Sequence, residues 1–278
     1  MFMRVSVVQM SPTADKTENI AQARRLIEGA VASERPDLLA LPEIWTCLGG
    51  ARETKFAAAE ALPEPGGTGG PAYEFLRQMA IAHGIHVHGG SIGELAGGKL
   101  FNTSLVFAPA GQELARYRKI HLFDIITPDG TGYRESETYG AGEDVVTCDI
   151  AGTKVGLAIC YDLRFPELFL ALRRRHVELI MLPAAFTLQT GKDHWEVLLR
   201  ARAIETQTWL AAPACTGPHR GAKGDIRFTY GNSMIVDPWG HVVARASDGP
   251  GWATATIDPT RTARVRADMP MLEHRRLA

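Results

Sequence analysis

Apolar and polar positions alternate between two spacings along the chain, beginning at the amino terminus. Residues 4–10 form a mostly apolar run typical of a strand, residues 17–33 repeat apolar positions at helical spacing, and residues 37–41 are again a short apolar run. The apolar positions of the helical segment fall on one face, which suits packing against a sheet. This order predicts a β-α-β unit.

The same alternation continues toward the carboxyl end. Further helices are expected over residues 52–61, 72–82, 166–175 and 193–208. Further strands are expected over residues 85–90, 102–108, 113–118, 153–159, 178–182, 209–214, 227–236, 241–246 and 252–257. Residues 119–142 show little periodicity and many turn formers, which predicts a long functional loop. Because no linker or repeat interrupts the pattern, we expect a single α/β domain over residues 1–278, with helices layered on β-sheet.

The charge balance and the cysteines narrow the class of partner. Thirty basic and 31 acidic residues give a formal charge of −1, which favours neither nucleic acid nor an anionic membrane as a partner. No apolar stretch approaches the ~18 residues of a membrane span, and the amino terminus does not read as a secretion signal. Cys47, Cys148, Cys160 and Cys215 contain no CxxC pair, which favours reduced thiols and a cytoplasmic location.

Cys160 ends an apolar strand shortly before a helix that is expected to begin at Pro166. A turn of this kind displays the residue at its tip, where backbone amides and a helix amino terminus would favour a thiolate. Alternatively, Cys160 is a small core residue that finishes the strand, because free cysteines are often buried. The local sequence leaves both interpretations open.

A nucleophilic thiol needs a base, and no histidine of the chain matches a Cys-His signature. Glu43 and Cys160 both follow apolar strands, and open α/β sheets bind ligands at the carboxyl ends of their strands. Lys119 also ends a predicted strand. It is either part of a solvated basic cluster or an inward ammonium that stabilises an oxyanion, with carboxylates beside it. Glu135 and Glu137 of the long loop are equal candidates for such a partner.

Three motifs carry a family resemblance: Leu-Pro-Glu43, Tyr-Arg-Lys119-Ile-His-Leu-Phe-Asp and Ala-Ile-Cys160-Tyr-Asp-Leu-Arg-Phe-Pro-Glu. They resemble the Glu-Lys-Cys signatures of the nitrilase superfamily of carbon-nitrogen hydrolases. Residues 194–205 and 230–240 resemble its Nit branch, which contains ω-amidases and deaminated-glutathione amidases. The ending, residues 269–276, is more similar to the latter.

The resemblance implies a four-layer αββα sandwich and a thiol-dependent reaction. Cys160 would attack an amide carbonyl, Glu43 would accept the thiol proton, and Lys119 with the backbone N–H of Tyr161 would hold the oxyanion. Ammonia would leave, and water activated by Glu43 would hydrolyse the thioester. Glu135 corresponds to the second glutamate of the family and would orient Lys119 or the attacking water.

The implied substrate is a small amide that carries a carboxylate, of the deaminated-glutathione or ω-amide type. Arg164, four residues after the nucleophile, resembles the carboxylate-binding arginine of related carbamoylases, although it also fits an exposed residue near a helix start. Phe186 and Thr187 are further strand-end candidates for substrate binding. An N-carbamoyl amino acid remains an alternative substrate, because Asn232 stands where the Nit branch usually has histidine.

Neither a metal nor any other cofactor is expected. The resemblance implies a homodimer, or a higher assembly, formed through helices near residues 166–176 and 191–208. A nonenzymatic binding or scaffold relative is the alternative from another class, and the presence of all four catalytic residue types argues against it.

Two further sequence patterns resemble other kinds of active site. Gly-Gly-Ser91-Ile-Gly matches a serine nucleophile elbow, but an elbow must enter a helix and residues 94–102 read as a hairpin turn. His86 and His88 would share one strand face as metal ligands, but no companion ligands are evident. Neither pattern therefore predicts a site.

Overall fold

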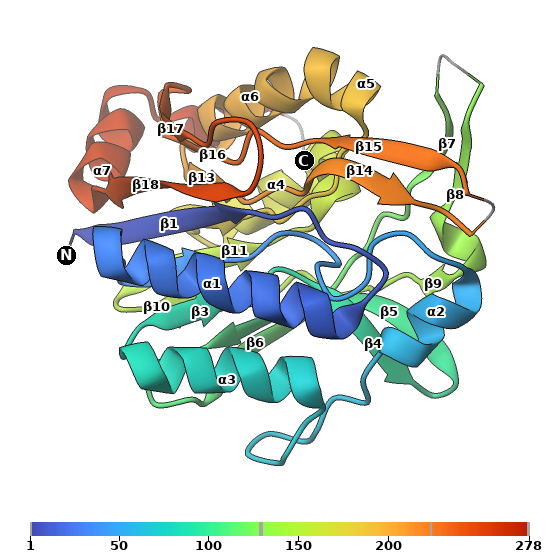
Figure 1. Ribbon diagram of the computed structural model, residues 1–278. Helices are drawn as coiled ribbons and strands as arrows, with labels where there is room; N and C mark the ends of the chain where they lie inside the picture. The colour runs from blue at the N-terminus through green and yellow to red at the C-terminus, as the bar shows by residue number, and fades with distance from the viewer. Residues whose placement is uncertain (1, 128–129, 223, 277–278) are drawn as a thin grey trace.

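The computed structural model describes residues 2–127, 130–222 and 224–276, and Figure 1 shows sheets stacked between helices α1 and α3 on one side and α6 on the other. The helices are α1 (Lys16–Glu34), α2 (Arg52–Ala58), α3 (Pro71–His83), α4 (Pro166–Arg174), α5 (Leu188–Thr190), α6 (Glu196–Thr206), α7 (Pro259–Asp268) and α8 (Met271–His274). Short irregular helices are η1 (Glu135–Glu137), η2 (Cys160–Arg164) and η3 (Gly191–Trp195).

Within the described residues, the strands form two large sheets and two small ribbons. The first sheet has the order β18-β1-β2-β3-β5-β4, with β6 and β9 also paired to β5. Its strands are β1 (Met3–Gln9), β2 (Leu38–Ala40), β3 (His86–His88), β4 (Ile92–Ala96), β5 (Lys99–Phe107), β6 (Glu113–Arg118), β9 (Tyr139–Gly140) and β18 (Gly251–Ile257).

The second sheet has the order β10-β11-β12-β13-β16-β17. Its strands are β10 (Thr147–Ile150), β11 (Thr153–Leu157), β12 (Leu179–Met181), β13 (Trp209–Ala212), β16 (Met234–Val236) and β17 (Val242–Arg245). The ribbons pair β7 (Asp124–Ile126) with β8 (Gly132–Arg134) and β14 (Thr216–Arg220) with β15 (Ile226–Tyr230).

A parallel trio lies at the centre of each sheet: β1, β2 and β3 in the first, and β11, β12 and β13 in the second. The other pairs of the two sheets are antiparallel, apart from β5 with β9. Both trios are covered on both faces, as parallel strands usually are. The expected αββα sandwich is thereby confirmed.

Strand β2 shows why the central strands read as continuous apolar runs. Leu38 and Ala40 point into the core between the two sheets, whereas Leu39 and Leu41 belong to the core under α1 and α3. Successive side chains of a strand point to opposite faces, so a strand buried on both faces has no polar positions. The next turn after this strand carries Glu43.

Helix α1 anchors that turn. The carboxylate of Asp15 caps the helix by accepting from the backbone N–H groups of Thr17 and Glu18. Asn19, on the buried face of the helix, donates to the backbone oxygens of Thr13 and Thr46 at 2.8 and 3.1 Å. The segment that follows Glu43 is thus fixed to the first helix.

Several predicted boundaries need correction. The strand expected over residues 227–236 is two strands, β15 and β16, in different sheets. They are separated at Gly231, whose φ of 70° favours glycine and where an added Cβ would lie 2.7 Å from the Thr216 hydroxyl. Strands β10 and β14 were not predicted, and the β-rich ending also contains helix α7.

Two further expectations were wrong in detail. The helix expected over residues 193–208 is preceded by the π turn η3, and α6 begins only at Glu196. The long loop expected over residues 119–142 contains the β7–β8 ribbon, η1 and β9. Among the helices of the described ranges, none has both the length and the apolar character to traverse a bilayer.

Candidate active site

Cys160 stands at the first position of η2, and two residues separate it from the end of β11. Its φ is 48°, in the left-handed region that residues with a Cβ rarely adopt. The conformation is held by the Cys160 N–H, which donates to the Pro183 carbonyl at 2.9 Å, and by the Ile159 N–H, which donates to the Asp162 carboxylate at 2.8 Å. Surroundings that fix an unfavourable backbone conformation are common at functional sites.

Asp162 is fully buried and joins this turn to the segment that carries Lys119. Its carboxylate accepts from the Tyr117 hydroxyl at 2.7 Å and from the His121 backbone N–H at 3.0 Å. The His121 ring also contacts the carboxylate, through Nδ1 at 2.7 Å, and stacks on Phe165. Asp162 therefore fixes the two segments relative to each other, although nothing in the sequence marked it out from the rest of its motif.

Glu43, Lys119 and Glu135 meet in the interior. The Lys119 ammonium lies 2.9 Å from Glu43 Oε1 and 2.8 Å from Glu135 Oε2, and only 1% of its side chain is exposed. The other Glu43 oxygen accepts from the Ala185 backbone N–H at 2.8 Å. The Phe123 backbone N–H donates to Glu135 Oε2 at 2.6 Å. Of the two loop glutamates, the structure places Glu135 beside Lys119 and exposes Glu137.

Asn102 connects the two carboxylates, and the sequence analysis missed it. Its side-chain amide donates to Glu43 at 2.9 Å and to Glu135 at 3.4 Å. Its backbone carbonyl accepts from the Lys119 N–H at 2.9 Å. The available signal was a polar run, residues 102–104, inside an otherwise apolar strand, because buried polar side chains need partners.

The charge of Lys119 is stabilised by its neighbours. Burial alone would lower the pKa of Lys119, but Glu135 and Glu43 more than offset that effect and raise the pKa well above its ordinary value. The ammonium therefore stays protonated at neutral pH. A permanent buried positive charge is suited to stabilising an oxyanion.

The surroundings of Cys160 favour the protonated thiol over the thiolate. Burial, the Glu43 charge and a hydrogen bond to Glu43 raise the pKa of Cys160 well above its usual value, against the lowering effect of Lys119. Helix α4 begins at Pro166, as expected, so its amino terminus lies beyond the intervening η2 turn rather than at Cys160. Cys160 therefore holds its proton in the free protein and needs a base to react.

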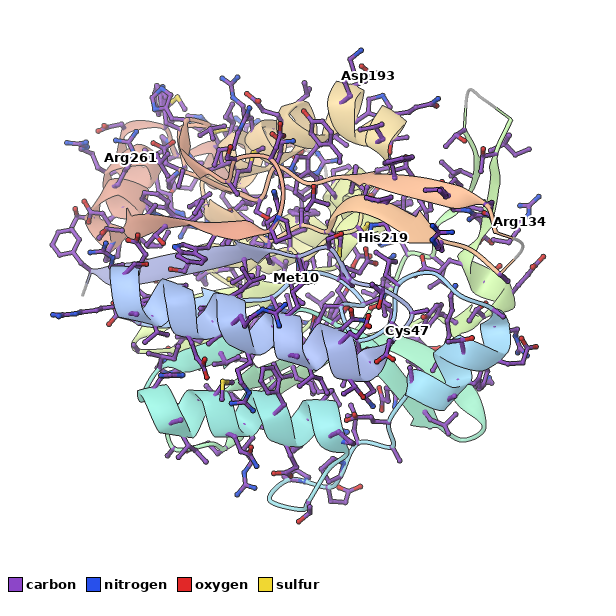
Figure 2. The ribbon with its side chains drawn as sticks, viewed as in Figure 1. Met10, Cys47, Arg134, Asp193, His219 and Arg261 are labelled. Atoms are coloured by element: carbon purple, nitrogen blue, oxygen red, sulfur yellow. The ribbon has the colours of Figure 1, made fainter. Side chains whose placement is uncertain are left out.

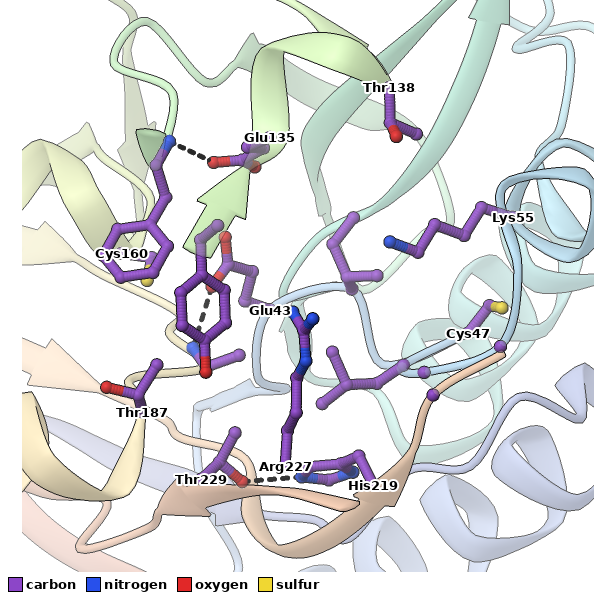
Figure 3. A pocket seen from close by; sticks show the side chains of 18 of the residues that line it. Glu43, Cys47, Lys55, Glu135, Thr138, Cys160, Thr187, His219, Arg227 and Thr229 are labelled. Carbon is purple, nitrogen blue, oxygen red and sulfur yellow. Dashed lines mark hydrogen bonds between the residues drawn. The ribbon is translucent and has the colours of Figure 1, made fainter. Parts of the chain in front are cut away.

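These groups open onto a cavity of about 550 Å³. Figure 3 shows Glu43, Glu135 and Cys160 on one side of it, contributed by segments far apart in the sequence. The wall is completed by residues after β2, by helix α2 and by the β14–β15 ribbon. Such a volume lies in the range of cavities that enclose metabolite-sized ligands.

The predicted oxyanion residue Tyr161 and the predicted substrate-binding residues divide into two groups. Tyr161, Phe186 and Thr187 line the cavity. Arg164 is not among the described lining residues. Its guanidinium lies 3.3 Å from His194 Nδ1 and over the rings of Tyr161 and Phe186, so it contacts the wall from its other side.

Neither rival pattern forms a site. Ser91 accepts from the Ile44 backbone N–H at 2.9 Å and is followed by strand β4 rather than by a helix. His86 and His88 lie in β3, and burial lowers the pKa of His88 to about 3. In the part of the chain that the structure describes, no group of three His, Cys, Asp or Glu side chains is arranged to hold a metal ion.

The four-layer sandwich and the buried thiol, ammonium and carboxylates define a nitrilase-like hydrolase. The chain belongs to the carbon-nitrogen hydrolase family, whose model matches residues 4–267. It is an amidase that acts on carbon-nitrogen bonds other than peptide bonds. This family membership favours an enzyme over the alternative of a nonenzymatic binding or scaffold relative.

Curated relatives and solved structures belong to the Nit branch. The chain is 44% identical to a deaminated glutathione amidase of Synechocystis and 38% identical to the omega-amidase NIT2 of Xenopus tropicalis. The first match covers 97% of both chains, and the second covers 98% of this chain and 95% of the relative. The NitFhit protein of C. elegans superimposes with a TM-score of 0.88 at 35% identity, over 99% of this chain and 65% of the NitFhit chain.

The charge of Glu43 gives a direct test of the site's electrostatics. We expect Glu43→Gln to lower the pKa of Cys160, because a neighbouring negative charge is removed while the Lys119 cation stays. Alkylation by iodoacetamide, followed over pH with mass mapping of Cys160, should then have a lower midpoint than in the wild type. Glu137→Gln, on the exposed side of the same region, is the control and should leave the midpoint in place. An unchanged or higher midpoint in Glu43→Gln would contradict the arrangement.

Proposed function

We propose that the protein hydrolyses a carboxylate-bearing amide through a thioester on Cys160. The observation that carries the proposal is the buried contact of Lys119 with Glu43 and Glu135 beside Cys160, at the wall of a cavity large enough for a metabolite. The names of the relatives suggest deaminated glutathione or an ω-amide of a dicarboxylic acid as the substrate.

In the acylation step, Glu43 removes the proton of the Cys160 thiol as the sulfur attacks the amide carbonyl carbon. The carbonyl π electrons move to the oxygen, and the Lys119 ammonium and the Tyr161 N–H stabilise the resulting oxyanion. Tyr161 is suited to this role because it lines the cavity and follows the first residue of η2. The first N–H groups of a helical turn have no acceptor inside the turn.

The intermediate then loses its amine. The carbon-nitrogen bond breaks as Glu43 returns its proton to the leaving nitrogen, so a primary amide releases ammonia and a secondary amide releases the corresponding amine. Water, deprotonated by Glu43, next attacks the thioester, and the carboxylic acid leaves as the Cys160 sulfur regains a proton. Glu43 alternates between base and acid throughout.

Glu135 acts in this proposal by holding Lys119. Both of its oxygens lie within 3.1 Å of the Lys119 ammonium, and the Phe123 N–H and the Asn102 amide approach the same carboxylate. A carboxylate engaged on both oxygens is better placed to orient a cation than to deprotonate water. Of the two roles that the family resemblance allows, positioning of Lys119 is favoured.

The size of the cavity favours the larger substrate. A volume of about 550 Å³ exceeds what the ω-amide of a short dicarboxylic acid fills, whereas a tripeptide-sized amide such as deaminated glutathione suits it. Phe186 and Thr187 are proposed to contact the substrate from the wall. Arg164 is proposed to support Phe186 and Tyr161, over whose rings its guanidinium lies.

The proposal also covers the domain organisation, the cellular location and the assembly of the protein. A single domain over residues 1–278 is supported by a core that contains side chains from β1 to β18. A cytoplasmic location is supported by the four cysteines, which are all free thiols. A homodimer through α4 and α6 is supported by Val197 and Ile204 of α6, which are 66% and 42% exposed.

A substrate panel with a nucleophile variant tests the reaction. We expect the wild type to hydrolyse deaminated glutathione with a higher kcat/KM than ω-amides or N-carbamoyl amino acids, with the released amine or ammonia as the readout. Cys160→Ala should show no turnover and should bind substrate, because the sulfur that forms the thioester is missing. Circular dichroism should show an unchanged fold.

The matched control is Cys148→Ala, which removes a thiol that lies in strand β10 and outside the described cavity lining. It should retain full activity. Hydrolysis at the wild-type rate by Cys160→Ala would contradict the assigned nucleophile. A preference for an N-carbamoyl amino acid would identify the enzyme as a carbamoylase instead of an amidase of the proposed type.

The assembly is tested on the exposed face of α6. We expect Val197→Glu with Ile204→Glu to convert a dimer into monomers, because two charges would have to be desolvated in an apolar contact. Light scattering coupled to gel filtration measures the mass of each form. Glu53→Gln on α2 is a control that should not change the mass, and a monomeric wild type would refute the proposed dimer.

A further inference from the structure

Two cationic side chains reach the cavity from parts of the chain that take no part in the proposed reaction. Lys55 lies in helix α2, and Arg227 lies in strand β15 of the β14–β15 ribbon. Both residues line the cavity, and Figure 3 shows both side chains pointing into it, with Lys55 across the open space from Cys160. They form the wall opposite the nucleophile.

Lys55 has an unmatched charge. The residue is half-buried, and its ammonium makes no hydrogen bond or ion pair with any other residue of the described ranges. Burial lowers the pKa of Lys55, and the nearby Arg227 cation lowers it further, against the opposing effects of Cys47 and Glu135. An ammonium held out of water without a partner favours the approach of an anion.

The guanidinium of Arg227 has N–H donors that a ligand can use. Its Nε donates to the Asp225 carboxylate at 3.1 Å, and its guanidinium lies over the Tyr133 ring at 4.7 Å. The Asp225 contact is half-exposed, with 46% and 44% of the two side chains accessible, so it neutralises Arg227 only weakly. The remaining N–H groups of the guanidinium are available to a planar carboxylate.

The other charged groups of the wall are already engaged or peripheral. Arg52 donates to the Glu137 backbone oxygen and lies over the Phe56 ring. Arg134 is exposed at the edge of the molecule (Figure 2). Burial lowers the pKa of His219, so its ring adds no charge at neutral pH. Lys55 and Arg227 are therefore the cations of this wall with capacity for a ligand.

The cavity is polarised from one wall to the other. At the reactive wall a single ammonium, Lys119, faces two carboxylates, Glu43 and Glu135, so this wall is negative. The wall of Lys55 and Arg227 is positive. Fields inside a concave, partly desolvated site act strongly on a charged ligand, and this polarity orients a molecule with its anionic end away from the nucleophile.

We propose that Lys55 and Arg227 form an anion subsite that binds a substrate carboxylate remote from the scissile amide. Arg227 supplies the bidentate contact and Lys55 the point charge. The substrate class is thereby defined as amides with a negatively charged end several bonds away from the reacting carbonyl. The assignment rests on the proposed amide hydrolysis and deepens it. The anchoring role expected for Arg164 passes to Lys55 and Arg227.

Deaminated glutathione offers such a carboxylate on each side of the scissile amide, one on the acyl side and the glycine carboxylate on the amine side. The test compares it with its analogue capped as a carboxamide at the glycine end, and an ω-amide with its methyl ester forms the second pair. For each substrate, kcat and KM are measured for the wild type, Lys55→Met, Arg227→Met and the double variant.

We expect each single variant to lose roughly 10- to 100-fold in kcat/KM on the substrate whose carboxylate the subsite binds, mostly through KM. The loss should fall to less than about 3-fold on the matched analogue in which that carboxylate is capped. A loss confined to the first pair assigns the subsite to the amine side, and a loss on the ω-amide assigns it to the acyl side. Equal losses on the two members of both pairs, or no loss on any substrate, would overturn the proposal.

Arg220→Met and Lys99→Met are the controls, because both remove an exposed cation outside the described lining of the cavity. Binding is measured separately by calorimetry with the Cys160→Ala protein and the same acid and capped analogues. If the wild type fails to hydrolyse any of these amides, the proposed function fails. The anion subsite then stands only if Lys55→Met or Arg227→Met, introduced into the Cys160→Ala protein, weakens binding of the acid but not of the capped form.

Discussion

The contact of one buried ammonium with two carboxylates is the constraint on which the site depends. Burial destabilises the charged form of Lys119 by more than any single neighbour stabilises it. The ammonium keeps its charge because Glu43 and Glu135 approach it from separate segments. Removing one partner of a buried ion pair typically costs about 3–5 kcal/mol, since a charge is left uncompensated. The turn after β2, the end of β6 and the segment at η1 must therefore fold together.

The same constraint determines the state of the thiol. A carboxylate close enough to neutralise Lys119 also faces Cys160, and its negative charge keeps the sulfur protonated. In the free protein the sulfur of Cys160 is therefore protonated and is not a thiolate. A protonated thiol reacts more slowly with unspecific electrophiles than a thiolate does.

The sequence was informative where the chemistry coincides with a strand end. Glu43 and Cys160 follow strands whose apolar runs are continuous because both faces are buried, so their places at one edge of the sheets followed from the pattern. Asn102 could not be found in that way, since its partners lie far from it along the chain. Lys55 and Arg227 were missed for the same reason: an exposed-looking helix and a short ribbon become cavity walls only through tertiary packing. The break at Gly231 falls in the short polar stretch Gly231-Asn232-Ser233, a turn signal that the single strand expected over residues 227–236 ran through.

The β14–β15 ribbon lies outside both large sheets, and helix α2 belongs to neither of the two main helical layers. Both segments line the cavity, and neither contributes Glu43, Lys119, Glu135 or Cys160. Substitutions on them therefore change the lining of the cavity more directly than they change the reactive groups. A scaffold divided in this manner allows one ancestral reaction to diverge toward many metabolites by remodelling its periphery.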